Sequence, residues 1–383
     1  MAAIHLPRTI RIGGGVLNEL PAVLAAAGLA RPLIVTDAWM VSSGLLERVE
    51  ALLTAAGISM RAFTEVVPDP TVASIEAGCS FLAQGDHDCV IGLGGGSPID
   101  SAKMIAVKRE RRVAELKAPH QEDAPGLPVI AIPTTAGTGS EATRFTVITD
   151  AETDEKMLCA GLAYLPLIAV VDYELTLSKP ARLTADTGID SLVHAVEAYV
   201  SKRANPFADT LALSAMRLIW PNLPRACADP HDHAAREALM LGALQAGIAF
   251  SNSSVALVHG MSRPIGAHFH VSHGLSNAML MPVVTQWSAP SALPRYAQCA
   301  RAMGLADDAE ADQSAVGRLV EALHQINADL KVPSPRDYGI DPDRWTALLP
   351  LMAEQALGSG SPANNPRVPD ATEIEALYRQ VWH

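Results

Sequence analysis

Short apolar runs, each followed by a polar or glycine-rich turn, recur through the first half of the chain. The runs are continuous rather than alternating, and they occupy residues 32–36, 89–93, 128–133 and 167–171. Segments with helical periodicity, such as residues 45–56, lie between them. Continuous apolar strands separated by helices are typical of a parallel sheet that is covered on both faces. We therefore expect an α/β domain with a mostly parallel sheet in this half.

The pattern changes after about Lys179, where runs of β-branched residues become rare and alanine, leucine, histidine and glutamate dominate. This pattern predicts helices, which we place at residues 190–200, 207–220, 233–250 and 316–330. Pro180 would break a helix or turn the chain, so we expect the domain boundary there. The sequence thus predicts an α/β domain over residues 1–180 and an all-helical domain over residues 181–383.

The charge balance limits the partners that this chain can have. It carries 29 lysines and arginines against 41 aspartates and glutamates, which gives a formal net charge of -12. Such an acidic protein repels phosphate backbones and anionic lipid head groups. No stretch reaches the roughly 18 consecutive apolar residues that a membrane span needs. We therefore expect no nucleic-acid partner and no membrane partner.

Cysteine usage indicates a reducing compartment. The five cysteines form an odd set without CxxC spacing: Cys79, Cys89, Cys159, Cys227 and Cys299. The first residues of the sequence also lack the apolar segment of a signal peptide. We expect reduced, partly buried thiols in a cytoplasmic protein.

A glycine-rich turn follows the second apolar run and contains Gly94, Gly95 and Gly96. We expect Ser97 to cap the next helix, Pro98 to take its first position and Asp100 its third. A helix N-terminus behind glycines has free N–H groups that can bind the pyrophosphate of a dinucleotide. The alternative is an ordinary strand–helix turn, because the segment is neither a GxGxxG motif nor a Walker loop.

Polar side chains also end two other apolar runs. Asp37 follows the first run, and Thr134, Thr135 and Thr138 follow the third. Ligands of open α/β sheets bind at the carboxyl edge of the strands, where an acidic side chain can bind the ribose hydroxyls of NAD. Each segment alone is equally compatible with a polar turn, and Asp37 with a turn cap.

The second half supplies candidates for a metal site. Asp190 and His194 are four residues apart, so on a helix they share one face. His259 and His273 lie further along the chain. One carboxylate and three imidazoles suit Fe²⁺, Zn²⁺, Co²⁺ or Mn²⁺, and the lack of a thiolate disfavours Cu(I) and iron–sulfur clusters.

Other histidines keep this assignment open at the level of spacing alone. The chain has 12 histidines, so chance clustering is a real alternative, and dispersed core or surface histidines would give the same pattern. No spacing argument excludes His268 or His270 as members of the site.

Taken in order, these segments resemble the iron-containing (group III) alcohol dehydrogenase family over nearly the whole chain. Beyond the turns already described, the resemblance rests on residues 188–197, 259–267, 273–274 and 365–367. It implies a dehydroquinate synthase-like fold, in which an N-terminal dinucleotide-binding α/β domain is followed by an all-helical domain. It also implies a homo-oligomer, with a dimer as the simplest form.

The resemblance further implies two sets of site residues. The metal, iron with zinc as the alternative, would be bound by Asp190, His194, His259 and His273. NAD would be bound by Asp37, Gly94, Gly95, Gly96, Ser97, Asp100, Thr134, Thr135 and Thr138.

One position departs from the family pattern. Many members carry a second histidine four residues after the third ligand, where this chain has Arg263. A fixed cation there would bind an anionic group and so favour an acid-bearing aldehyde. The alternative is that Arg263 pairs with a surface acid.

The expected reaction is hydride transfer between C4 of a nicotinamide and a small primary alcohol or aldehyde whose oxygen is bound to the metal. The proton leaves through water or a nearby histidine, either His268 or His270. The catalytic candidates are therefore His259, His273, Arg263 and His268.

Other activities share this architecture. The nearest alternative is a maleylacetate reductase, and a non-catalytic protein that binds NAD and a metal is a second. Zinc glycerol dehydrogenase and dehydroquinate synthase are disfavoured by the complete set of one aspartate and three histidines.

Overall fold

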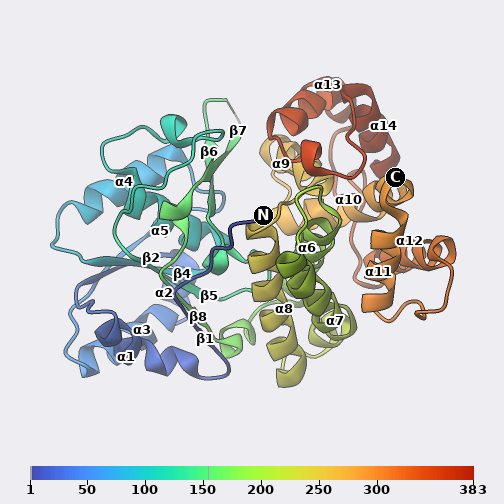
Figure 1. The fold of residues 1–383 in the computed structure, drawn as a ribbon. Coiled ribbons are helices and arrows are strands. Elements are labelled where there is room, and N and C mark those ends of the chain that lie inside the picture. The colour runs from blue at the N-terminus through green and yellow to red at the C-terminus, as the bar shows by residue number, and fades with distance from the viewer. Residues whose placement is uncertain (1, 154) are drawn as a thin grey trace. The chain divides into compact units, whose positions relative to one another are not determined.

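The computed structural model describes residues 2–153 and 155–383. The chain divides into two compact units, Ile4–Ser178 and Lys179–His383 (Figure 1). Each unit is considered by itself below.

The first unit is built on a six-stranded sheet in which all paired strands run parallel. Its strand order is β1-β8-β5-β4-β2-β3. The strands are β1 (Thr9–Ile12), β2 (Pro32–Asp37), β3 (Arg61–Val66), β4 (Cys89–Gly94), β5 (Val129–Pro133) and β8 (Ile168–Val171). The four apolar runs are therefore β2, β4, β5 and β8, which confirms the expected parallel sheet.

Helices cover both faces of this sheet (Figure 1). They are α1 (Leu20–Ala26), α2 (Ala38–Ser42), α3 (Leu45–Ala55), α4 (Val72–Leu82) and α5 (Gly96–Lys108). Side chains of a strand alternate between faces, so Leu33 and Val35 pack with α4 and α5 while Ile34 packs with α1 and α3. Burial on both faces explains why the central strands are apolar at every position.

Two edge strands and a hairpin lack that signal. β1 and β3 lie at the two edges of the sheet and are only partly buried, so no continuous apolar run marks them. An antiparallel hairpin, β6 (Phe145–Asp150) with β7 (Glu155–Ala160), forms a second sheet.

The second unit consists of helices in its described residues, as expected. They are α6 (Ala181–Val200), α7 (Pro206–Ala228), α8 (His233–Ser251), α9 (Leu257–Phe269), α10 (His273–Ser288), α11 (Leu293–Ala302), α12 (Asp312–Asp329), α13 (Pro342–Gly358) and α14 (Ala371–Val381). The first three predicted helical stretches lie within α6, α7 and α8, and the fourth lies within α12 except for its last residue, Leu330, which caps that helix. Helices α6, α7 and α8 pack against one another, and α6 also packs against α10 (Figure 1).

Short 3₁₀ helices complete the described elements: η1 (Val16–Glu19), η2 (Val113–Leu116), η3 (Ser140–Ala142), η4 (Leu162–Tyr164), η5 (Tyr173–Thr176), η6 (Ala289–Ala292) and η7 (Pro362–Asn364). Among the described residues, no helix has the length and apolar character needed to cross a bilayer.

Candidate functional site

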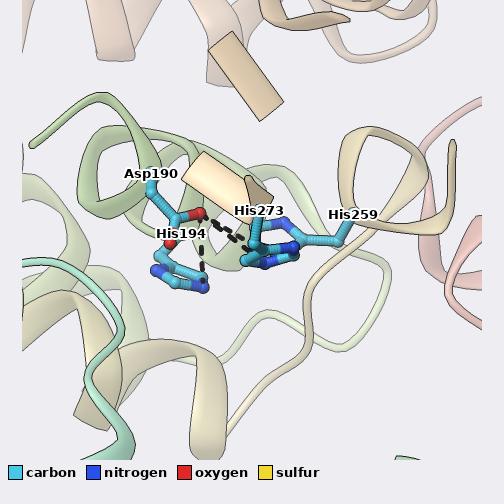
Figure 2. A group of neighbouring side chains, drawn as sticks. All are labelled: Asp190, His194, His259 and His273. Atoms are coloured by element: carbon cyan, nitrogen blue, oxygen red, sulfur yellow. Dashed lines mark ion pairs between the residues drawn. The ribbon is translucent and has the colours of Figure 1, made fainter. Parts of the chain in front are cut away.

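Four side chains from three helices converge in the second unit. Asp190 and His194 lie on α6, His259 on α9, and His273 is the first residue of α10. One ligand atom from each lies within 4.8 Å of the others. Figure 2 shows the carboxylate of Asp190 turned toward the three imidazoles. The structure thus brings together the four predicted ligands.

The spacing of these atoms suits a single ion. Asp190 Oδ1 lies 3.5 Å from His259 Nε2, 3.8 Å from His273 Nε2 and 4.0 Å from His194 Nε2. Two donors bound at about 2.1 Å to one tetrahedral ion would be about 3.4 Å apart. The three distances to Asp190 are close to this value, and the four ligand atoms all lie within 4.8 Å of one another, so three nitrogens and one oxygen could share one ion after small side-chain movements. This donor set fits Fe²⁺ or Zn²⁺.

Only one of the four side chains in the cluster is exposed to solvent. Asp190, His194 and His259 are buried, whereas the side chain of His273 is 36% exposed. The glycine after His273 lets α10 approach α6 closely, because a Cβ on Gly274 would lie 2.5 Å from the carbonyl oxygen of Asp186. Gly274 therefore helps to bring His273 next to Asp190.

The pKa values of the cluster reflect its mutual interactions. Burial raises the pKa of Asp190, but the imidazoles of His194, His273 and His259 outweigh burial and hold it well below its ordinary value. Burial lowers the pKa of His259, but hydrogen bonds and charges of Asp190 and Glu197 outweigh burial and raise it. A proton therefore competes with a metal ion for the ring of His259, which is neutral above its raised pKa.

Glu197 is a supporting residue to which the sequence analysis gave no role. Its carboxylate accepts hydrogen bonds from the backbone N–H groups of Ala256 and Val258, at 2.8 and 2.6 Å. It also lies 2.7 Å from His259 Nδ1. A proton held on Nδ1 by this carboxylate leaves the Nε2 lone pair of His259 free for a metal. The signal available in the sequence was its position three residues after His194 on the same helix.

His268 and His270 do not belong to the cluster. The Nε2 atom of His268 is 2.8 Å from Gln355 Oε1 on α13. His270 is exposed and ends α9 with a left-handed backbone, at a φ of 55°. The cluster therefore comprises Asp190 and the three histidines implied by the resemblance, without either of the two alternatives.

Arg263 lies one helical turn after His259 on α9. Its Nη1 atom is buried and has no hydrogen-bond partner. Burial lowers the pKa of its guanidinium to about 10, and the charge of Glu197 opposes that shift. A surface acid does not satisfy this nitrogen.

The glycine turn of the first unit differs in detail from the expectation. Helix α5 begins at Gly96 with Gly95 as its N-cap, so neither Ser97 nor Pro98 takes the predicted cap or first position. The helix starts two residues earlier because glycines permit the tight entry: Gly94 has a φ of 146°, and a Cβ there would lie 2.5 Å from Pro98 Cγ. The N–H groups of the glycine turn and of Ser97 precede the first hydrogen bond of α5, which the N–H of Ile99 donates to the carbonyl oxygen of Gly95, so they remain available to a ligand.

Asp100 and Lys103 support this turn from inside the unit. Asp100 accepts hydrogen bonds from Ser140 Oγ at 2.6 Å and from the N–H of Val147 at 2.9 Å. Lys103 is fully buried and donates to Ser140 Oγ, Thr143 and the carbonyl oxygen of Phe145, at 2.8–3.1 Å. Burial lowers the pKa of Lys103 to about 8, although Asp100 and Glu141 oppose the shift. Both side chains are thus engaged in holding the segment after β5.

The predicted threonines and Asp37 lie at the same carboxyl edge. The N–H of Thr134 donates to the carbonyl oxygen of Gly94, and Thr138 packs against Gly96, while Thr135 lies near Gly95. Asp37 ends β2, the neighbour of β4, and accepts a hydrogen bond from the N–H of Met40 at 3.0 Å. The carboxylate therefore caps α2 as well as standing at the edge of the sheet.

Comparisons with known proteins agree over the whole chain. The family model described as iron-containing alcohol dehydrogenase matches residues 7–173, and that of the C-terminal part of the Fe-containing alcohol dehydrogenase family matches residues 184–382. The chain is 35% identical to the NAD-dependent methanol dehydrogenase of Bacillus methanolicus, with 100% of each chain covered.

Two solved structures are also similar. A 1,3-propanediol oxidoreductase matches with a TM-score of 0.95 and 33% identity, with 100% of each chain covered. The sulfoacetaldehyde reductase of Bifidobacterium kashiwanohense, solved in complex with NAD⁺, matches with a TM-score of 0.88 and 27% identity, covering 100% of this chain and 98% of that one.

Proposed function

The chain belongs to the iron-containing alcohol dehydrogenase family, and on this premise we propose that it is a metal-dependent, NAD(H)-linked alcohol dehydrogenase or aldehyde reductase. Asp190, His194, His259 and His273 would hold the metal, because one ligand atom from each lies within 4.8 Å of the others. The bound metal supplies Lewis acidity to the substrate oxygen, and the nicotinamide supplies or accepts the hydride.

The residues of the first unit would bind the dinucleotide. The glycine turn Gly94–Gly96 and Ser97 offer backbone N–H groups to the pyrophosphate. Asp37 would accept hydrogen bonds from the ribose hydroxyls and repel the additional phosphate of NADP. Thr134, Thr135 and Thr138 would line the nicotinamide side. Asp100 would act through Ser140 and Val147 rather than by contact with the cofactor.

The observation that carries the proposal is the convergence of one carboxylate and three imidazoles in a buried site. The test combines His194→Ala with metal removal by a chelator. We expect the loss of NADH oxidation with short aldehydes, while NADH binding, followed by its fluorescence, survives. His231→Ala, which changes an exposed histidine, is the matched control and should keep its activity. Full activity of the chelated, metal-free protein would refute the scheme.

The same assay separates the alternatives. A maleylacetate reductase would act on maleylacetate and ignore chelators. A non-catalytic protein would bind NADH and the metal without oxidising NADH in the presence of any short aldehyde supplied with Fe²⁺.

Arg263 supports an aldehyde that carries a carboxylate or sulfonate as the substrate. Its buried Nη1 has a free donor position one turn from His259, and the similar sulfoacetaldehyde reductase acts on an aldehyde with a sulfonate group. Arg263→Gln keeps a similar length and removes the charge. We expect kcat/KM to fall further for acidic aldehydes than for neutral ones, and equal losses on both would reject this role.

A homodimer in the cytoplasm is the proposed form of the enzyme. All five cysteines are free, and burial raises the pKa of Cys79 to about 11 and of Cys227 to about 11, which keeps both thiols protonated. Light scattering after size-exclusion chromatography tests the dimer, and fractionation of the source cells tests the location.

A further inference from the structure

A buried asparagine lies against the candidate metal ligands. Asn277 is on α10, four residues after His273, and it is fully buried. Its amide nitrogen Nδ2 lies 2.6 Å from Asp190 Oδ1, 3.2 Å from His273 Nε2 and 3.3 Å from His259 Nε2. The other end of the same amide, Oδ1, is buried without a hydrogen-bond partner.

The three acceptors are the atoms that a metal would use. Asp190 Oδ1 is the carboxylate oxygen that faces the imidazoles. In the neutral form of His259, Nε2 has a lone pair, because Glu197 lies 2.7 Å from Nδ1 and favours the proton of the ring on that atom. The amide can therefore donate one hydrogen to the Asp190 carboxylate and share the other between the two imidazoles.

A metal and this amide compete for part of that set. The Nε2 of a neutral imidazole has a single lone pair, so it cannot accept from Asn277 and bind a metal at the same time. A carboxylate oxygen has more than one acceptor position, so the contact with Asp190 can persist. Two of the three contacts must therefore break when a metal binds.

We propose that Asn277 is a positioning residue for the metal-free site, where its amide keeps Asp190, His259 and His273 converged until a divalent metal takes the imidazole lone pairs. This inference rests on the proposed metal centre. It predicts that Asn277 stabilises the metal-free protein more than it stabilises the metal-loaded protein.

The test compares Asn277→Leu with the wild type, each metal-free and saturated with Zn²⁺. We expect the substitution to lower the Tm of the metal-free protein more than that of the Zn²⁺-loaded protein. The Zn²⁺-induced rise in Tm then exceeds that of the wild type. In a chelator competition, the Kd for Zn²⁺ should fall by about fivefold, as expected for one hydrogen bond of ordinary net strength, shared between the two imidazoles, that exists only without metal.

A matched control is Asn365→Leu. Asn365 is also a buried asparagine, and its amide donates to Ser288 Oγ at 2.9 Å and to the carbonyl oxygen of Arg367 at 2.7 Å. Neither acceptor belongs to the cluster, so this substitution should lower the Tm of both forms equally. Should Asn277→Leu fail to fold, Asn277→Ser, which keeps one donor hydrogen, gives the same comparison with a smaller difference.

The outcomes separate the inference from the function on which it rests. An equal drop in Tm of both forms of Asn277→Leu would overturn the inference, and so would weaker Zn²⁺ binding, because either would assign Asn277 to packing or to the loaded site. If Zn²⁺, Fe²⁺ and Co²⁺ all failed to raise the Tm of the wild type, the metal centre and the inference would both be overturned.

Discussion

Replacement of Glu197 is the sharpest test of how the protein prepares a histidine to bind a metal. Its carboxylate accepts from two backbone N–H groups at the start of α9 and from His259 Nδ1. Glu197→Gln keeps the size but gives up the charge and one of the two acceptor oxygens. Residues that orient a metal ligand typically change affinity by about 10–100-fold when they are replaced. We expect Glu197→Gln at the lower end of that range and Glu197→Ala at the upper end.

The stability effect follows from the same contacts. Glu197→Ala leaves the buried N–H groups of Ala256 and Val258 without an acceptor, at about 1–3 kcal/mol for each group. The metal-free protein should therefore lose about 2–6 kcal/mol of unfolding free energy. Urea unfolding measures this loss, and competition with a coloured chelator measures the affinity for Zn²⁺.

Asp172→Asn is the matched control for both measurements. Asp172 is fully buried and accepts from the backbone N–H groups of Gly15, Leu17 and Glu174, each at 3.1 Å, but it touches no imidazole of the cluster. It should lose stability and keep its Zn²⁺ affinity. Wild-type Zn²⁺ affinity in Glu197→Gln and Glu197→Ala alike would refute the reasoning.

Two further predictions concern protons and the buried lysine. The pKa of His259 is raised in the metal-free protein, so protons compete with the metal for this ring at pH values at and above the ordinary pKa of histidine. The Kd for Zn²⁺ should therefore rise as the pH falls from 8 to 6, and a pH-independent Kd would contradict this. The contribution of protonated His259 to the stability of the metal-free protein is present below about pH 6.5 and is lost as the pH rises through the raised pKa of this residue. Lys103→Met should lower the unfolding free energy by about 3–5 kcal/mol in urea titrations, because Asp100 is left without its buried cation. Lys108→Met, whose partner Glu76 is half exposed, should lose less than about 1 kcal/mol, and equal losses would sink the comparison.

The sequence predicted those parts of the fold in which burial is symmetrical. Strands β2, β4, β5 and β8 are covered on both faces, and their continuous apolar runs were sufficient to identify them. β1 and β3 were missed because edge strands with one exposed side carry mixed polarity. The predicted start of α5 was wrong by two residues. Ser97 and Pro98 are residue types that favour a helix start, but Gly94 allows the chain to turn into the helix earlier.

The site was predictable to a different degree. Helical spacing alone placed Asp190 and His194 on one face, but only the family resemblance selected His259 and His273 over His268 and His270. Spacing cannot select them, because the approach of α10 to α6 depends on packing, such as the contact that Gly274 permits with Asp186. Glu197 and Asn277 were within reach, since each lies three or four residues after a ligand on the same helix.

Every ligand-bearing helix thus continues with a polar side chain one turn beyond its last ligand: Glu197 on α6, Arg263 on α9 and Asn277 on α10. Asp190 and Glu197 carry one formal negative charge each and Arg263 carries one positive charge, so the metal-free cluster has one net negative charge when its imidazoles are neutral. A divalent ion reverses the sign to one formal positive charge. A positive site stabilises an alkoxide relative to its alcohol, and it also attracts a carboxylate or sulfonate on the substrate. The supporting residues and the proposed acid-bearing aldehyde are therefore consistent with one electrostatic arrangement, in which Glu197 offsets part of the charge of Arg263 without pairing with its buried Nη1.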